Sequence, residues 1–294
     1  MDGILIINKE KGYTSHDVVA CLRGILHQKK IGHTGTLDPN AEGVLPVCLG
    51  RATKVCELLT DTDKTYEAVL RLGVVTDTQD LTGRVLAQSD AVPGEEEVVS
   101  AIRSFEGELE QIPPMYSAIK IGGRKLVDLA RAGKEVERPA RRVTVYRIRI
   151  LEMDLPRVRM EVSCSKGTYI RTLCHDIGQK LGCGGAMEAL VRTRAAGFGR
   201  EEALTLGKVE ALAAAGELES RLVPLERIFA DLPRFQIAAE HAKALQNGNR
   251  LKLSWGVCRG EASGRMAVYD EDGRFAAVYE RMPGTEELKV VKMF

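Results

Sequence analysis

The sequence predicts an α+β protein whose first domain is built on a largely antiparallel sheet and is followed by a small β-rich C-terminal domain. Segments with strand periodicity and segments with helical periodicity mix without strict alternation. Two strand-like runs, 143–151 and 158–164, are joined by a short link at Leu155-Pro156, which favours an antiparallel hairpin over a parallel crossover. The length of 294 residues exceeds what one core usually fills, so one large and one small domain are expected.

The N-terminal elements follow from their apolar patterns. Residues 3–9 alternate too little for a half-exposed strand and are typical of a buried one, and apolar side chains at helical spacing predict a helix that begins at Ser15. Residues 32–46 contain three glycines and two prolines, so we expect an ordered loop there. Beyond it the pattern predicts a helix over 52–59, a strand over 65–72 and an amphipathic helix over 96–105.

A further helix is expected over 168–181, ending at Gly182. One face is apolar, and we expect the exposed face to carry Arg171, His175 and Lys180. Prolines 224 and 233 then bracket a candidate linker, so the predicted domains are 1–224 and 234–294, with the boundary between Leu225 and Pro233. In the second domain we expect a helix over 238–246, a turn at 247–248 and strands over 266–269 and 275–279.

Composition and missing motifs argue against several classes of protein. No apolar run reaches the roughly 20 residues that span a bilayer, and the N-terminus lacks the features of a signal peptide, so we expect a cytoplasmic protein that does not bind a membrane. The seven cysteines never form a C-x-x-C pair, which indicates neither a disulfide framework nor a zinc site. The absence of metal-binding and phosphate-loop motifs argues against a hydrolase and leads us to expect no metal.

Positive charge is concentrated in one segment although the formal net charge is only +1. Between Pro114 and Arg149 there are ten basic residues and three acidic ones. Such a segment could line a phosphate backbone, or it could simply be a solvated charged surface.

Asp38 is the first candidate for chemistry. It precedes a proline, which biases its backbone towards the extended region and constrains its side chain. Asp-Pro is also a common helix opening, so Asp38 could instead cap a helix that starts at Pro39. This motif alone does not decide between the two interpretations.

Five motifs in this order extend the argument to most of the chain: NKEKGYTS at 8–15, GHTGTLDPNAEGVLPVCLGRATK at 32–54, DKTYEA at 63–68, PPMYSAIK at 113–120 and CSKGTYIRTL at 164–173. Together they resemble the bacterial tRNA pseudouridine synthases that modify uridine 55. The resemblance implies the pseudouridine-synthase fold, a C-terminal PUA-like RNA-binding domain, and a monomeric enzyme without a cofactor. The implied partner is tRNA, contacted at its T-arm and acceptor stem.

The same resemblance implies the site residues. It places the catalytic aspartate at Asp38, the active-site tyrosine at Tyr66, a second aromatic at Tyr169, the ion-pair partner of the aspartate at Arg171 and an apolar pocket residue at Leu190. Moving uracil from a bond through N1 to one through C5 needs an anionic group beside the sugar and a group that moves the C5 proton. Asp38 and Tyr66 would supply these functions. The sequence leaves open whether Asp38 attacks C1′, attacks the ring or removes a 2′ proton. Without the resemblance, Arg171 would be read as part of a surface ion pair.

Three further residues are expected to contact RNA. By resemblance His33 would fill the gap left by the extruded base, although a histidine after glycine can also be a simple turn residue. Lys166 lies just before the 168–181 helix and could meet a phosphate, or mark an ordinary helix start. Lys9, the third residue, belongs to the first motif.

The sequence departs from the family pattern at two positions. Glu10 replaces the usual proline after Lys9, and Val127 replaces a common tyrosine further along the chain.

Two rival functions share these features. A non-enzymatic RNA-binding or RNA-folding protein would use the basic segment and the C-terminal domain without needing Asp38, Tyr66 and Arg171 together. A guide-RNA-dependent pseudouridine synthase would share the central motifs, but this chain is short and lacks a basic tail.

Overall fold

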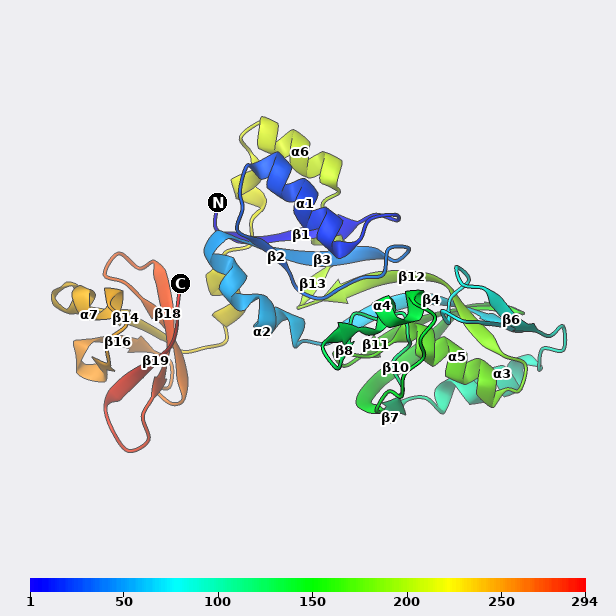
Figure 1. Ribbon diagram of the computed structural model, residues 1–294. Coiled ribbons are helices and arrows are strands. Elements are labelled where there is room, and N and C mark those ends of the chain that lie inside the picture. The colour runs from blue at the N-terminus through cyan, green and yellow to red at the C-terminus, as the bar shows by residue number, and fades with distance from the viewer.

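A nine-stranded sheet forms the centre of the larger part of the molecule (Figure 1). The structure is a computed structural model that describes residues 1–294. In spatial order the main strands are β1 (Gly3–Lys9), β3 (Glu42–Leu49), β12 (Gly185–Ala195), β4 (Lys64–Leu72), β11 (Arg157–Cys164), β10 (Arg141–Asp154) and β7 (Gly107–Gln111). The short strands β2 (Ile31–His33) and β13 (Phe198–Gly199) pair with β3 and β12.

Neighbouring strands of this sheet run antiparallel, except that β3 and β12 are parallel. The predicted hairpin is β10–β11, and its link lies at residues 155–156 as expected. The prediction of an α+β fold with a largely antiparallel sheet is therefore confirmed. Two small hairpins stand apart from the sheet: β5 (Val74–Thr76) with β6 (Val85–Gln88), and β8 (Lys120–Ile121) with β9 (Arg124–Lys125).

Helices cover the sheet at both ends (Figure 1). Helices α1 and α6 pack beside β1 and β3, whereas α3 and α5 pack on β10 and β12. The helices of this part are α1 (Ser15–Leu26), α2 (Cys56–Thr60), α3 (Glu95–Arg103), α4 (Leu126–Arg131), α5 (Ile170–Lys180) and α6 (Leu206–Ala214), with 3₁₀ helices η1 (Gly50–Val55), η2 (Arg200–Glu202), η3 (Leu218–Arg221) and η4 (Leu225–Phe229). The helix expected over 52–59 is thus divided into η1 and α2.

The prediction of a loop over 32–46 is wrong at both ends of that segment. β2 includes His33, and β3 begins at Glu42 and contains Pro46. Pro46 has no N–H to donate, but its carbonyl accepts a hydrogen bond from the Thr34 backbone N–H at 3.1 Å. Gly43 is required for a different reason: with φ at +110°, a Cβ there would lie 2.2 Å from the Arg192 carbonyl oxygen.

Helix α5 differs from the prediction in one important respect. It begins at Ile170, two residues later than expected, and Gly182 follows its end with φ at +73°. Its expected exposed face includes Arg171, but the Arg171 side chain is only 5% exposed. A polar residue can be buried there because its guanidinium finds partners inside the protein, as described below.

The C-terminal residues form a separate six-stranded sheet with its own core (Figure 1). In spatial order its strands are β15 (Leu251–Lys252), β19 (Glu287–Met293), β18 (Phe275–Arg281), β17 (Arg265–Tyr269), β14 (Arg234–Ile237) and β16 (Gly256–Arg259). The expected 238–246 helix is divided into η5 (Ala239–His241) and α7 (Ala242–Gln246), and η6 (Leu253–Trp255) precedes β16. Every helix of the protein is too short or too polar to cross a bilayer.

The two parts touch through a small contact. The Phe229 ring of η4 stacks on Phe275 of β18 at a centroid distance of 5.3 Å and also approaches Phe294. Lys54 of η1 donates a hydrogen bond to the Met293 carbonyl at 2.9 Å. The C-terminal sheet therefore lies against η1 and η4 rather than against the cavity described next.

Candidate active site

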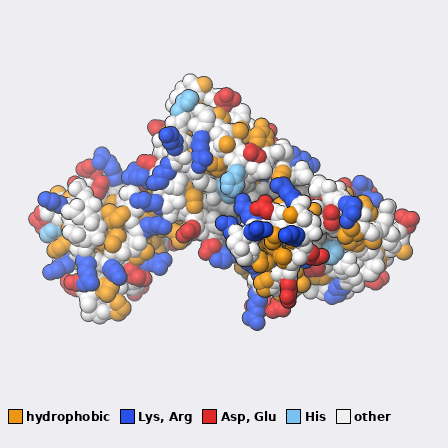
Figure 2. All heavy atoms as spheres, viewed as in Figure 1, with side chains coloured by type: hydrophobic (Ala, Val, Ile, Leu, Met, Phe, Trp, Pro, Cys, Tyr) orange, Lys and Arg blue, Asp and Glu red, His pale blue; other side chains and the backbone are white.

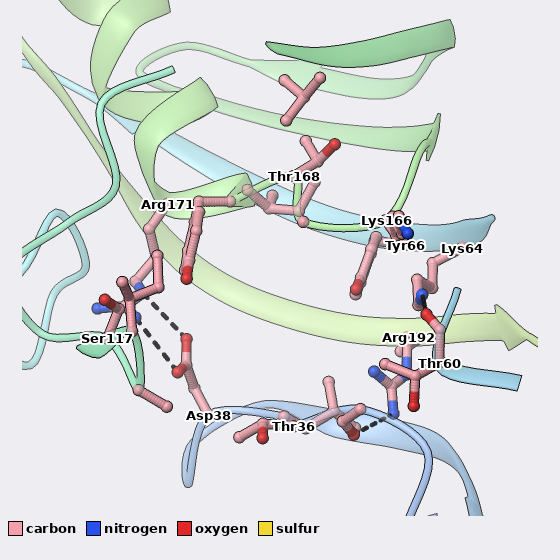
Figure 3. Close-up of a pocket in the computed structure, with 18 of the residues that line it drawn as sticks. Thr36, Asp38, Thr60, Lys64, Tyr66, Ser117, Lys166, Thr168, Arg171 and Arg192 are labelled. Carbon is pink, nitrogen blue, oxygen red and sulfur yellow. Dashed lines mark hydrogen bonds and ion pairs between the residues drawn. The ribbon is translucent and has the colours of Figure 1, made fainter. Parts of the chain in front are cut away.

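A cavity of about 630 Å³ opens beside β4 and β12. Figure 3 shows Asp38 and Arg171 facing each other at one side and Tyr66, Lys64 and Arg192 at the other. Six of the eight residues predicted for the site line this cavity: Asp38, Tyr66, Lys166, Tyr169, Arg171 and Leu190. The structure therefore brings together residues from four of the five sequence motifs and from β12.

Asp38 lies in a turn and not at the start of a helix. The backbone N–H of Ala41 donates to the Asp38 carbonyl at 3.0 Å, and strand β3 begins one residue later. The alternative in which Asp38 caps a helix is therefore wrong. Its neighbours are fixed on both sides, because the Ser15 hydroxyl accepts from Leu37 N–H at 2.9 Å and the Pro39 carbonyl accepts from Gly12 N–H at 3.0 Å. The turn consequently points the carboxylate into the cavity.

Arg171 forms the ion pair with Asp38 through two of its nitrogens. Nε lies 2.9 Å from Oδ2, and Nη2 donates to Oδ1 at 3.2 Å. Two further donors of Arg171 bind backbone carbonyls: Nη1 donates to Thr78 and Nη2 to Tyr116. A two-pronged contact of this kind fixes the orientation of the carboxylate as well as its charge.

The electrostatics around Asp38 are balanced between opposing effects. Burial raises the pKa of Asp38, and the positive charge of Arg171 opposes that rise. Asp80, whose Oδ2 lies 3.8 Å from Arg171 Nη1, adds a second negative charge and raises the Asp38 pKa further. Arg171 is buried in this pair, but the Asp38 side chain is 38% exposed. The carboxylate can therefore meet a ligand in the cavity.

Tyr66, Leu190 and Arg192 share the face of the sheet that forms the floor of the cavity. Arg192 lies directly opposite Tyr66 in the β4–β12 pairing, so their side chains emerge on the same face, and Leu190 follows two residues away. All three side chains are buried, and burial raises the pKa of the Tyr66 hydroxyl while Arg192 opposes that rise. The floor thus combines an aromatic ring, an aliphatic side chain and a cation.

Tyr169 closes the cavity at the start of α5. The Gln111 side chain fixes its backbone by accepting from Tyr169 N–H at 3.0 Å and donating to the Tyr169 carbonyl at 3.3 Å. Burial raises the pKa of the Tyr169 hydroxyl. The hydroxyl is therefore neutral at physiological pH, and the ring can act as a flat wall.

Lys9 does not line the cavity. Its side chain is fully buried, and Nζ donates to the carbonyls of Glu10, Tyr13 and Pro39. Burial lowers the Lys9 pKa to about 8, although Asp38 opposes that shift. With all three donors used inside the protein, Lys9 holds the turn that carries Asp38.

His33 also lies outside the cavity lining. Its ring packs edge-on against His16 at a centroid distance of 5.1 Å, and burial lowers its pKa. The imidazole is therefore neutral near pH 7. His33 and the cavity residues Gly35 and Thr36 belong to the same short segment, so His33 lies beside the cavity rather than in it.

Positive charge dominates the cavity. Six basic side chains and two carboxylates line it, which gives a formal net charge of +4. Lys166 forms an exposed ion pair with Asp61 at 2.8 Å, and Arg141 and Arg142 line the cavity from the basic segment found in the sequence. On the face drawn in Figure 2, Lys and Arg side chains also gather around the hollow between the C-terminal sheet and the rest of the molecule. The charge is suited to an anionic ligand larger than the cavity itself.

Three further charged residues of the site, Asp80, Lys64 and Arg192, were not predicted from the sequence. Asp80 follows β5, and no local pattern distinguishes it from other surface aspartates. Arg192 could have been found, because alternation along β12 places it on the same face as Leu190, but a strand over 185–195 was not predicted.

Comparison with known proteins agrees with this arrangement. The family model described as "TruB family pseudouridylate synthase (N terminal domain)" matches residues 23–170, and the "tRNA pseudouridylate synthase B C-terminal domain" matches 171–230. Proteins named tRNA pseudouridine synthase B are 47% identical in Bacillus licheniformis, over 96% of this chain and 94% of theirs, and 48% identical in Lachnoclostridium phytofermentans, over the full length of both.

Solved structures with a similar fold are found at lower sequence identity. A chain in the crystal structure of a Cbf5-Nop10-Gar1 complex is 28% identical with a TM-score of 0.74, covering 99% of this chain and 84% of that one. A chain in an H/ACA RNP bound to a substrate RNA containing 2′-deoxyuridine has a TM-score of 0.73 at 27% identity, with the same coverage. With the sequence relatives, these matches establish that the chain belongs to the TruB family of pseudouridylate synthases.

Proposed function

We propose that this protein isomerises uridine 55 in the T-loop of tRNA to pseudouridine. The observation that carries the proposal is the Asp38 carboxylate, held by two nitrogens of Arg171 and facing a cavity floored by Tyr66. The relatives named tRNA pseudouridine synthase B support tRNA as the substrate. The substrate and product are isomers, so the reaction needs no net oxidant or reductant, and we propose that it proceeds without a cofactor.

Asp38 and Tyr66 divide the chemistry between them. The glycosidic bond from N1 to C1′ breaks, a bond from C5 to C1′ forms, C5 loses a proton and N1 gains one. Asp38 supplies the negative charge beside the sugar, as nucleophile or as base for the 2′ proton. Tyr66 moves the C5 proton, and Arg171 keeps Asp38 oriented and opposes the rise in its pKa.

The target base must leave the stacked T-loop before it can enter the cavity, at a cost of a few kcal/mol. Tyr66, Tyr169 and Leu190 provide flat and apolar walls for the uracil. His33, which lies beside the cavity, would occupy the gap left in the loop. Lys166 would leave Asp61 to meet a phosphate, a small change because both side chains are more than half exposed.

Lys9 has a different role from the direct RNA contact expected from sequence. Its ammonium holds the Pro39 carbonyl next to Asp38 and has no free donor for RNA. We therefore assign Lys9 to the positioning of the Asp38 turn.

We further propose two domains, a catalytic domain over 1–224 and a PUA-like RNA-binding domain over 234–294. Separate sheets and separate cores support this division. The basic hollow between them suits a helical stem, so the second domain would contact the acceptor stem while the extruded uridine of the T-arm enters the cavity. A single chain holds every residue assigned to the site, which supports a monomer.

A guide-RNA-dependent synthase is the second candidate, because the chains in the Cbf5 complexes share the fold. The higher identity to the bacterial tRNA enzymes, at 47–48% compared with 27–28%, favours the tRNA function. Incubation of the purified protein with defined tRNA transcripts, without guide RNA, tests this. Pseudouridine mapped to position 55 alone supports the proposal; RNA binding without any pseudouridine would favour a purely RNA-binding protein.

A further inference from the structure

Arg192 is a buried cation without a carboxylate partner. Its side chain is 1% exposed, yet no Asp or Glu forms an ion pair with it. Nε donates to the Val44 carbonyl at 2.7 Å and Nη2 donates to the Gly35 carbonyl at 3.4 Å, while the guanidinium lies on the same face of the sheet as its cross-strand neighbour Tyr66. An unpaired buried charge is costly, and an apolar side chain of similar size would usually serve the fold better. Stability alone is therefore a poor reason for an arginine here.

Arg192 lies next to Tyr66 in the sheet. The two residues are direct partners across the β4–β12 pairing and emerge on the same face of the sheet. In Figure 3 the two side chains lie on the same side of the cavity, away from Asp38 and Arg171. The cavity thus contains one arginine for the aspartate and a second for the tyrosine.

We propose that Arg192 is a positioning residue of the isomerisation, which holds the Tyr66 hydroxyl in place and offsets the negative charge on its oxygen while the C5 proton is transferred. This inference rests on the proton-transfer role proposed for Tyr66. Arg192 lies beneath the substrate and acts through Tyr66.

The proton balance explains why a cation is needed. To accept the C5 proton, Tyr66 must first release its own hydroxyl proton to water. When the C5–H bond breaks, its electron pair returns to the uracil ring and the proton passes to the tyrosine oxygen. N1, whose bond to C1′ has broken, takes a proton from water, so the number of protons is unchanged. A phenolate in a buried site is unfavourable unless a positive charge lies beside it.

The charges around Tyr66 agree with this geometry. Burial raises the pKa of Tyr66, and the largest opposing effect is the charge of Arg192. Lys64, the other nearby cation, donates to the carbonyls of Thr60 and Thr62. Asp38 and Cys164 also face Tyr66, and each raises its pKa. Arg192 is the cation directly across the sheet from Tyr66.

The test compares variants on a defined tRNA transcript by single-turnover pseudouridine formation as a function of pH. Arg192→Met keeps most of the volume and removes the charge, whereas Arg192→Lys keeps a charge. Arg194→Gln, two residues along β12 and exposed, is the matched control. Melting temperature and tRNA affinity are measured for each variant, and the reaction is repeated with uridine deuterated at C5.

We expect Arg192→Met to bind tRNA normally and to lose about 10²- to 10³-fold in turnover, on the scale of a lost acid–base or electrostatic contribution. The rise of its rate with pH should move to higher pH, and the deuterium isotope effect should increase because transfer of the C5 proton becomes slower. Arg192→Lys should recover part of the rate, and Arg194→Gln should match wild type. A folded Arg192→Met with the wild-type pH profile and isotope effect would overturn the proposal. If Arg192→Met does not fold, Arg192→Gln, which can still donate to the Val44 carbonyl, carries the same test.

A second set of variants separates this inference from the proposed function. Arg192→Met should cause no further loss when it is combined with Tyr66→Phe, since both changes remove the same step. Near-normal turnover of Tyr66→Phe would remove the role of Tyr66 and the inference together. An inactive Tyr66→Phe beside a fully active Arg192→Met would leave the proposed function intact and reject only the role of Arg192.

Discussion

Two nitrogens of Arg171 contact the two carboxylate oxygens of Asp38, at 2.9 and 3.2 Å. Arg171 is buried and also bonded to two backbone carbonyls, so it cannot turn away without leaving polar groups unpaired. The pair joins the turn before β3 to the first turn of α5, which are 133 residues apart in sequence. Orientation and ionisation of Asp38 therefore depend on Arg171.

Asp38→Asn should abolish chemistry without unfolding the protein. The amide keeps the size of the side chain and can still accept from Arg171, but it lacks the charge required beside the sugar. We expect turnover to fall by about 10³-fold or more, with tRNA affinity retained. Single-turnover pseudouridine formation and a tRNA dissociation constant, measured beside wild type, check this; substantial product from the variant would contradict the mechanism.

The melting temperature of Asp38→Asn should not fall through loss of the charge. The pKa of Asp38 is raised in the folded protein, so the folded state binds this proton more tightly than the unfolded state does. Ionised Asp38 therefore destabilises the fold as pH rises through the window above the unfolded value of 3.8. A variant with a much lower melting temperature at neutral pH would show that Asp38 has a structural role.

Removal of the Arg171 charge should change the pH dependence of the reaction. Turnover requires ionised Asp38, so the wild-type rate should fall as pH decreases through the raised pKa of this group. Arg171→Gln removes the charge that opposes the rise in the Asp38 pKa. The pH at which the rate has fallen by half should therefore be higher in this variant. Rates of single turnover across the acid range give both midpoints. An unchanged midpoint in a folded variant would separate the ionisation of Asp38 from Arg171.

Tyr66→Phe tests the second group of the site. The ring proposed to contact uracil remains and only the hydroxyl is lost, so RNA should bind with near-normal affinity while turnover falls by about 10²- to 10⁴-fold. Tyr169→Phe is the matched control, because Tyr169 is assigned only as a wall and should lose much less. If Tyr66→Phe and Tyr169→Phe behave alike, the proton-transfer role of the Tyr66 hydroxyl is wrong.

Much of the fold could be predicted from local patterns, because residues within or next to several helices and strands determine where those elements begin and end. Strand β1 matches its predicted range, and α1 begins at Ser15 because Thr14 and Asp17 form a capping box. The failures concern elements defined by distant partners. Strand β3 contains Gly43 and Pro46, and only its pairing with β1, β2 and β12 makes that segment extended.

The site could be predicted only as a list of residues, since their geometry depends on contacts between distant segments. Sequence resemblance named Asp38, Tyr66 and Arg171, but burial of Arg171 follows from carbonyls at positions 78 and 116, which no local pattern reveals. Lys9 shows how a sequence motif leaves the contacts of a residue open. A motif lysine was expected to contact RNA, whereas three nearby carbonyls occupy its ammonium group.

Charge reversal at Arg141 and Arg142 should weaken tRNA binding without changing which uridine is modified. Both side chains line the cavity, and Arg142 has only one distant partner, Glu110 at 4.0 Å. Phosphate contacts position an RNA but do not select a base. The slope of log affinity against log salt should become shallower by about 0.7 to 0.9 per lost contact. A change in the modified position at unchanged affinity would contradict this assignment.

Deletion of the C-terminal residues from Phe235 onward should discriminate between substrates. The C-terminal sheet contacts the rest of the protein through Phe229 and Lys54 and not through the cavity, so the catalytic residues keep their own core. If this sheet touches the acceptor stem, the truncated protein should bind full-length tRNA at least about tenfold more weakly, which corresponds to about 1.4 kcal/mol. Its affinity for an isolated T-arm hairpin should change little.

The comparison of two substrates controls for damage to the fold. Truncation exposes Phe229 and removes the acceptor for Lys54, so some loss of stability is expected whatever the sheet does. Such a loss lowers the active fraction equally for both RNAs and cancels in the ratio of the two affinities. A ratio that changes on truncation therefore reports a lost contact with RNA outside the T-arm. Equal losses on the two substrates would mean that the C-terminal sheet serves only to stabilise the neighbouring helices η1 and η4.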